Sequence, residues 1–153
     1  MVESKRWRRR ILHGLMLLAS AAASVGGAAA ADSVITYHGA ADRSGLYVAP
    51  ELTFAKAATV RLDPGFNATT LNGPIYGQPL YWVPPAGGGA ARIIVATEND
   101  FVYALDAGTG AQIWSTSLGT PVPAGDLPCG NIKPTEGVTG TPTIDPTTGI
   151  DYF

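Results

Sequence analysis

One stretch, Arg92 to Leu118, limits the possible folds of this chain more than any other part of the sequence. It reads RIIVATENDFVYALDAGTGAQIWSTSL, in which runs of β-branched, aromatic and aliphatic residues alternate with short polar segments. Such alternation predicts strands joined by tight turns. The first run, 93–96, is apolar at every position, which is typical of a strand covered on both faces. The predicted strands of this antiparallel meander are 93–96, 101–105 and 112–114.

The side chains in and after the second turn of the meander favour a tight turn followed by a packed strand. Asp106 can accept turn N–H groups with its carboxylate, while Gly108 and Gly110 can adopt a positive φ without a Cβ clash. Trp114, which follows the turn, is large enough to fill the seam between two packed sheets. An ordinary hairpin with a core tryptophan is the simpler interpretation of the same residues.

These residues resemble a known motif. Ala104, Asp106, Thr109, Gly110 and Trp114 are spaced as in the tryptophan-docking motif A-x-D-x-x-T-G-K-x-x-W of the quinoprotein (PQQ-dependent) alcohol dehydrogenase-like β-propellers. Only the lysine differs, because the chain has alanine at that position. The resemblance implies an all-β propeller built from PQQ-like repeats, in which the tryptophan lies between neighbouring blades. These five residues are therefore predicted to be a structural docking motif.

The N-terminal residues 1–31 have a composition of their own. Five of the ten basic residues of the chain lie here, followed by an apolar run from Ile11 to Ser20 and by an Ala/Gly-rich stretch. This order predicts the helix of a secretory signal peptide, cleaved near Ala31, and hence a periplasmic or secreted protein. The apolar run is too short for a lasting membrane span, so none is expected after cleavage.

The rest of the chain is acidic. It retains five basic and all but one of the 12 acidic residues, a net charge of about −6. Its basic residues are scattered and form no patch, which argues against a nucleic-acid partner.

Residues 32–153 are predicted to be the N-terminal part of a PQQ-like β-propeller. An N-terminal strand at 34–37 would pair with strands from the far end of such a propeller. Further strands are expected at 60–62 and at 75–83, the latter being the innermost strand of the first blade.

A sequence echo marks a repeat. GQPLYW begins at Gly77 and GTPTID begins at Gly140, so a repeat unit restarts there. The predicted segments are blade one at about 75–118, an inter-blade loop at 119–139 and the start of the next blade at 140–153.

About one and a half blades of four-stranded antiparallel meanders would be present, whereas closed propellers have roughly four to eight. We therefore expect a fragment that needs missing blades, or self-association through its exposed strand edges. The alternatives are a small stand-alone β-domain that oligomerises and a truncated reading frame with no functional product. Cys129 is the single cysteine, so it has either a free thiol or a partner outside this chain.

No catalytic, cofactor-binding or metal-binding residue can be assigned. A PQQ-dependent dehydrogenase would need Ca²⁺ ligands and a carboxylate base. The consecutive residues Glu98, Asn99 and Asp100 should point in different directions as turn residues, Glu136 is expected in a solvated loop, and His38 is expected in a turn. The sequence therefore favours a non-catalytic scaffold or binding module. The alternative is the N-terminal fragment of a periplasmic alcohol or sugar dehydrogenase whose catalytic residues, PQQ and calcium belong beyond residue 153.

Overall fold

The computed structural model describes residues 33–39, 41–68, 70–128 and 130–153. These residues belong to one compact unit, Ala31–Phe153. Within them the regular structure is mostly strand, with one short α-helix and one 3-10 turn, so the predicted all-β class is confirmed. The predicted signal peptide and Cys129 lie outside the described residues.

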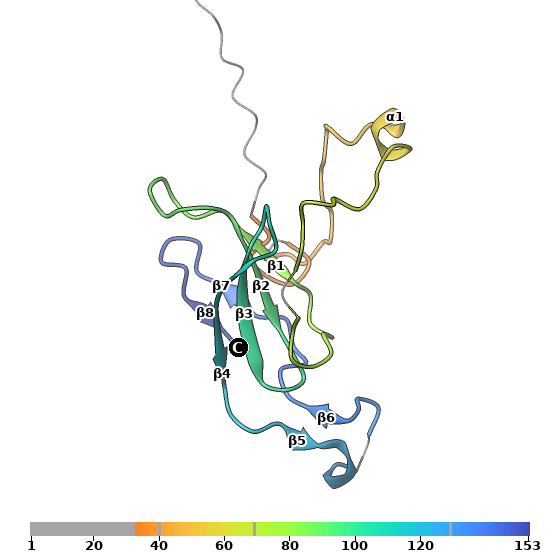
Figure 1. Ribbon diagram of the computed structural model, residues 1–153, viewed down its shortest axis with the longest axis vertical. Helices are drawn as coiled ribbons and strands as arrows, with labels where there is room; N and C mark the ends of the chain where they lie inside the picture. Colours follow the sequence, from red (N-terminus) through yellow and green to blue (C-terminus); the bar gives the residue numbers. More distant parts are fainter. Residues whose placement is uncertain (1–32, 40, 69, 129) are drawn as a thin grey trace, which may run out of the picture. The chain divides into compact units, whose positions relative to one another are not determined.

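The main sheet is a four-stranded antiparallel meander, in which each strand pairs with the next strand along the chain (Figure 1). The meander predicted from the central stretch is confirmed, and its first strand is shorter than the expected 75–83. The strands are β1 (Leu80–Trp82), β2 (Arg92–Ala96), β3 (Phe101–Asp106) and β4 (Gln112–Ser117).

One face of this sheet forms the hydrophobic core. Alternate residues of the inner strands point to it, as the period of two in a strand requires. Ile144, from a second hairpin, is 1% exposed and completes the cluster. The other buried members are Leu80, Trp82, Ile94, Ala96, Val102 and Ala104, with Ile35, Trp114 and Val138 packed around them.

The opposite face of the sheet is covered as well. Val95 and Tyr103 are paired across β2 and β3, and both are buried. The Tyr103 hydroxyl accepts the N–H of Asn72 at 3.0 Å, so the segment leading to β1 lies against this face. Ile94 and Val95 point to opposite faces, and both are buried, which confirms the expected strand with cover on both sides.

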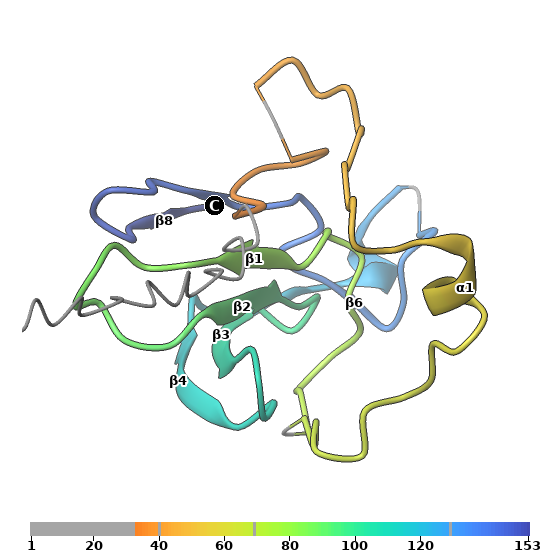
Figure 2. The same cartoon turned by 90° about the horizontal axis from the view of Figure 1, so that it is seen from above.

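A second hairpin packs beside β1 (Figure 2). It consists of β7 (Thr143–Ile144) and β8 (Asp151–Tyr152), paired antiparallel. The N-terminal segment bonds to both: Val34 exchanges two backbone hydrogen bonds with Tyr81, and the carbonyl of Ile35 accepts the N–H of Ile144 at 2.8 Å. The strand expected at 34–37 is therefore reduced to one β-bridge at Val34, and residues 36–38 form a bend and a turn.

Trp82 is the indole that contacts the second hairpin. Its side chain is 7% exposed, and its Nε1–H donates to the carbonyl of Pro146 at 3.4 Å. Gly149 has φ 71°, and a Cβ there would overlap the Trp82 ring. The guanidinium of Arg92 lies 5.2 Å from the ring centroid. The hairpin turn thus fits closely on the indole, and only glycine leaves room for this contact.

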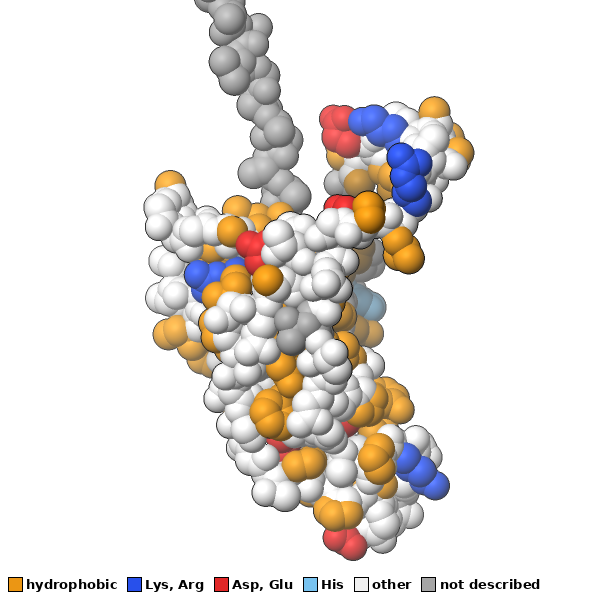
Figure 3. Space-filling view, viewed as in Figure 1, with side chains coloured by type: hydrophobic (Ala, Val, Ile, Leu, Met, Phe, Trp, Pro, Cys, Tyr) orange, Lys and Arg blue, Asp and Glu red, His pale blue; other side chains and the backbone are white. Residues whose placement is uncertain are grey.

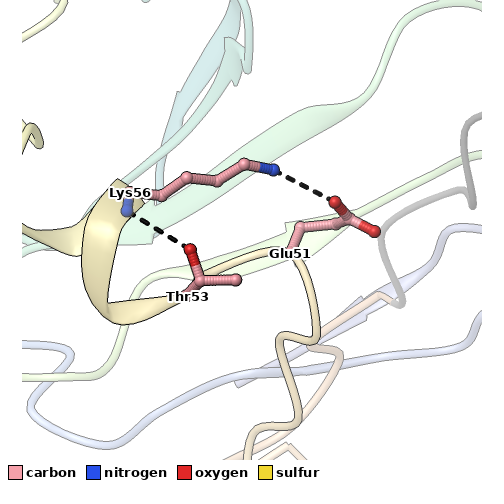
Figure 4. Close-up of polar contacts among 3 residues, drawn as sticks. All are labelled: Glu51, Thr53 and Lys56. Carbon is pink, nitrogen blue, oxygen red and sulfur yellow. Dashed lines mark hydrogen bonds and ion pairs between the residues drawn. The ribbon is translucent and has the colours of Figure 1, made fainter.

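The segment before β1 makes a loop outside the core. Its only helix among the described residues is α1 (Phe54–Ala57), which is capped by the Thr53 hydroxyl accepting the N–H of Lys56 at 3.3 Å (Figure 4). The Lys56–Glu51 ion pair, at 3.1 Å, is exposed and contributes little stability. The strand predicted at 60–62 is wrong, because these residues are exposed and have no strand partner.

The predicted inter-blade loop contains a small sheet of its own. β5 (Val122–Pro123) pairs with β6 (Thr135–Glu136), and the 3-10 turn η1 (Ala124–Asp126) follows β5 directly. The proline-rich composition did not indicate this pairing. Glu136 therefore lies in a strand and is partly buried, in contrast to the solvated loop position expected for it.

We expect Trp82→Ala to lower the free energy of unfolding by about 3–5 kcal/mol, because it removes a buried indole shared by the sheet and the second hairpin. Urea denaturation measures the loss. Trp114→Ala is the matched control and should cost less, since Trp114 is only partly buried. Equal losses for the two variants would contradict the central position of Trp82.

Candidate functional site

The turn between β3 and β4 is built around one carboxylate. Oδ1 of Asp106 accepts the N–H of Gly108 at 3.0 Å, and the N–H and hydroxyl of Thr109 at 2.8 and 2.9 Å. The Gly110 N–H donates to the Asp106 carbonyl at 2.8 Å, with φ 76° at Gly110. The Thr109 hydroxyl in turn accepts the N–H of Ala111 at 3.3 Å. Asp, Thr and Gly at this spacing therefore close the hairpin by themselves.

The second hairpin repeats this turn. Oδ1 of Asp145 accepts the N–H groups of Thr147 and Thr148, at 2.8 and 3.4 Å. Gly149 has φ 71° and donates to the Asp145 carbonyl at 2.8 Å, as Gly110 does to Asp106. The pattern Asp-x-x-Thr-Gly, read at 106–110 and again at 145–149, is the sequence signal that predicts both turns.

The hydrogen bonds of these turns lower the pKa of both carboxyl groups. The hydroxyl of Thr109 is the main cause that lowers the pKa of Asp106 below its usual 3.8, followed by the Thr109 N–H. For Asp145 the N–H of Thr147 is the main cause that lowers the pKa. In both turns the donors favour the ionised carboxylate.

The residues of the predicted docking motif lie together at the end of β3 and the start of β4. Ala104 is fully buried and pairs directly with Trp114, and the register shifts between Ala104 and Leu105. Trp114 is partly buried against the core. A Cβ at Gly110 would meet the backbone of Ala68 at 2.8–2.9 Å, so this glycine also permits a close chain approach. Asp106, Thr109 and Gly110 form the turn described above.

Glu98 is a buried carboxylate in the turn between β2 and β3. It is 0% exposed, and its Oε2 accepts the N–H of Gly137 at 2.9 Å and the hydroxyl of Thr139 at 3.0 Å. Oε1 is buried without a hydrogen-bond partner among the described residues. The turn position was predicted, but the burial was not, because the residues that cover Glu98 lie about forty positions later in the sequence.

The neighbours of Glu98 use their polar atoms for other contacts. The Asn99 side-chain oxygen accepts the hydroxyl of Thr135 at 2.7 Å, and its nitrogen donates to Asn72 at 2.9 Å. The Glu98 carbonyl also accepts the Thr135 hydroxyl, at 3.1 Å. Together these bonds attach the segment 135–139 to the β2–β3 turn. The arrangement joins the segment 135–139 to the turn and leaves Oε1 of Glu98 without a partner among the described residues.

Gln78 joins three separate segments. Its N–H donates to the Thr141 hydroxyl at 2.9 Å, which brings the two echoed sequences, at 77 and 140, side by side. Its side-chain oxygen accepts the N–H of His38 at 3.2 Å, and its side-chain nitrogen donates to the Tyr47 hydroxyl at 3.2 Å. His38 lies in a turn, as predicted, and has φ 61°. Sequence reasoning did not single out Gln78.

Within residues 33–39, 41–68, 70–128 and 130–153, no three His, Cys, Asp or Glu side chains are grouped to hold a metal ion. No helix there has the length and apolar character needed to cross a bilayer. Lys and Arg side chains form no single patch on the face shown in Figure 3.

Comparison with known proteins gives no relative: no protein-family model, curated protein or solved structure matches this chain.

The two turn carboxylates should make stability pH-dependent. Each has a lowered pKa in the folded state, so its contribution is complete above the usual 3.8 and is lost as the pH falls through the lowered value. Urea unfolding between roughly pH 6 and pH 2.5 should therefore show a steeper acid loss for the unchanged chain than for the double variant Asp106→Asn, Asp145→Asn. Asp126→Asn is the control, and identical acid profiles for all three would refute the assignment.

The Glu98 contacts predict a contrast between two substitutions. Glu98→Gln keeps a side-chain oxygen for Gly137 and Thr139, whereas Glu98→Ala leaves both donors unpaired in a cavity and should cost roughly 3 kcal/mol more. Chemical denaturation at neutral pH compares the two variants. The same pair of changes at Glu136, which is partly exposed, provides the control. Equal stability of the Gln and Ala variants at 98 would show that the bonds to 137 and 139 contribute nothing.

Proposed function

We propose that this chain is a segment of an exported PQQ-like repeat propeller that serves as a non-catalytic scaffold or binding module. The observation that carries the proposal is the repeated Asp-x-x-Thr-Gly turn in two hairpins that share one core. A repeat architecture needs such a unit, which buries its apolar face against the next unit. The match to the tryptophan-docking motif supports the same family.

The strand edges support the binding role. β4 is an edge strand of the main sheet, and its residues are mostly exposed, including the apolar Ile113. β8 belongs to a two-stranded sheet, and its residue Tyr152 and the following Phe153 are exposed. Exposed edges with apolar side chains are the places where further strands add. The partners we propose are further propeller blades or a second copy of the chain.

The described residues do not fit the calcium and PQQ site of a quinoprotein dehydrogenase. Such a site needs several oxygen ligands around one ion. Glu98 directs Oε2 to Gly137 and Thr139, and Asn99 directs its side-chain oxygen to Thr135. Oε1 of Glu98 is unpartnered, but no three His, Cys, Asp or Glu side chains are grouped there or elsewhere among the described residues. The alternative is a dehydrogenase whose catalytic residues belong to other segments. Titration of this chain with PQQ tests whether its own residues contribute to holding the cofactor.

Export is part of the proposal. The basic, apolar and small-residue order of residues 1–31 supports a secretory signal peptide, and a periplasmic or secreted location follows from it.

Titration of the purified chain with PQQ, with and without Ca²⁺, tests the proposal. A scaffold should give no saturable change in the absorbance or fluorescence of the quinone under either condition. Binding of one PQQ per chain that requires Ca²⁺ would contradict the scaffold and favour the dehydrogenase alternative. The variants Glu98→Gln and Glu136→Gln, titrated in parallel, would show whether either carboxylate contributes to such binding.

A further inference from the structure

An open concave surface of mixed polar and apolar lining lies where three segments meet near Gln78. It has a volume of about 540 Å³, within the range of small-molecule sites. Its lining comes from the N-terminal segment, from the residues before β1, and from the segment that leads into β7 together with the first residue of that strand. The residues that matter here are Thr36, Tyr37, Arg43, Tyr76, Gln78, Thr139, Thr141 and Thr143.

The lining combines one positive charge with hydroxyl groups and aromatic rings. It contains one cation, Arg43, and no carboxylate side chain. Among the described residues Arg43 has no ion-pair partner. Tyr37 and Tyr76 are 42% and 55% exposed, and the Tyr37 ring is stacked on His38 with its centroid 3.8 Å away, so one face of Tyr37 and the ring of Tyr76 are available to a ligand. Guanidinium groups bind carboxylates in a two-point geometry, and hydroxyl groups both donate and accept hydrogen bonds.

The site is held in shape before any ligand binds. Gln78 ties the turn at His38 to Tyr47 and to Thr141 through three hydrogen bonds. The Thr36 and Thr143 hydroxyls lie 3.2 Å apart and bond to each other. Preformed sites lose less entropy when a ligand binds.

The Arg43 backbone is constrained as well. Arg43 has φ 54°, in the left-handed region that few non-glycine residues adopt, and its carbonyl lies 3.0 Å from Nδ1 of His38. The following N–H, of Ser44, donates to the Asp42 carboxylate at 3.1 Å. Strained positions of this kind cost free energy and concentrate at functional sites. The strained backbone position here belongs to Arg43, the one cation of the lining.

We propose that this surface binds a small hydroxylated carboxylate of the sugar-acid class, such as a hexuronate. Arg43 binds the carboxylate, and the ring of Tyr76 and the free face of Tyr37 cover the apolar face of the sugar. The threonine hydroxyls and the Gln78 amide bind the sugar hydroxyls with the donor and acceptor positions that their internal bonds leave. This inference rests on the proposed binding-module function and names its ligand.

Isothermal titration of the full chain with sodium glucuronate, glucose and sodium acetate tests the proposal. Glucuronate should bind saturably, and glucose and acetate at least about tenfold more weakly, because each lacks one half of the recognised chemistry. No saturable binding of glucuronate would overturn the proposal, and so would acetate binding as tightly as glucuronate, which marks a simple anion site.

Two variants test whether Arg43 binds the carboxylate. Arg43→Gln should weaken glucuronate binding about tenfold or more and leave glucose unchanged, whereas Arg61→Gln, an exposed cation outside the lining, should change neither. Equal glucuronate affinity in both variants would refute the role of Arg43, and thermal melts confirm that each is folded. The PQQ titration is a separate readout, so its failure and a failure here are distinguishable.

Discussion

The contact between the Trp82 indole and the turn of the second hairpin is the interaction on which the rest of this structure depends. The main sheet has only three residues in β1, and the second hairpin has two residues in each strand. The second hairpin is not large enough to be stable alone, because an isolated two-stranded hairpin is at best marginal in water. The indole, Gly149 and Ile144 join it to the sheet in one core, and the N-terminal segment bonds to both through Tyr81 and Ile144.

Around this core, polar side chains fix the loops. Asp106 and Asp145 each close a turn, Glu98 attaches the segment 137–139, and Gln78 joins three chain segments. Of these groups, Gln78 lines the concave surface, and it is bonded to Thr141 in the segment that leads to β7. The proposed ligand site therefore depends on the same side-chain contacts that hold the loops on the small β core.

The sequence predicts the meander well, because its turns carry strong local signals in Asp106, Thr109 and Gly110. It predicts less where partners are distant in the sequence. The burial of Glu98 and the role of Gln78 depend on residues about 40 and 63 positions further along. The strand expected at 60–62 fails for a related reason: its alternating pattern has no neighbouring strand to pair with, so Leu62 is 94% exposed.

Native-state hydrogen exchange tests most directly whether the sheet and the second hairpin form one cooperative core. The account predicts that the amide hydrogens of Ile144 and Asp145 exchange with nearly the same opening free energy as those of β2 and β3. Exchange of the hairpin amides through a separate, much more frequent opening would show that the hairpin is held only loosely. That result would contradict the shared core and with it the proposed repeat architecture.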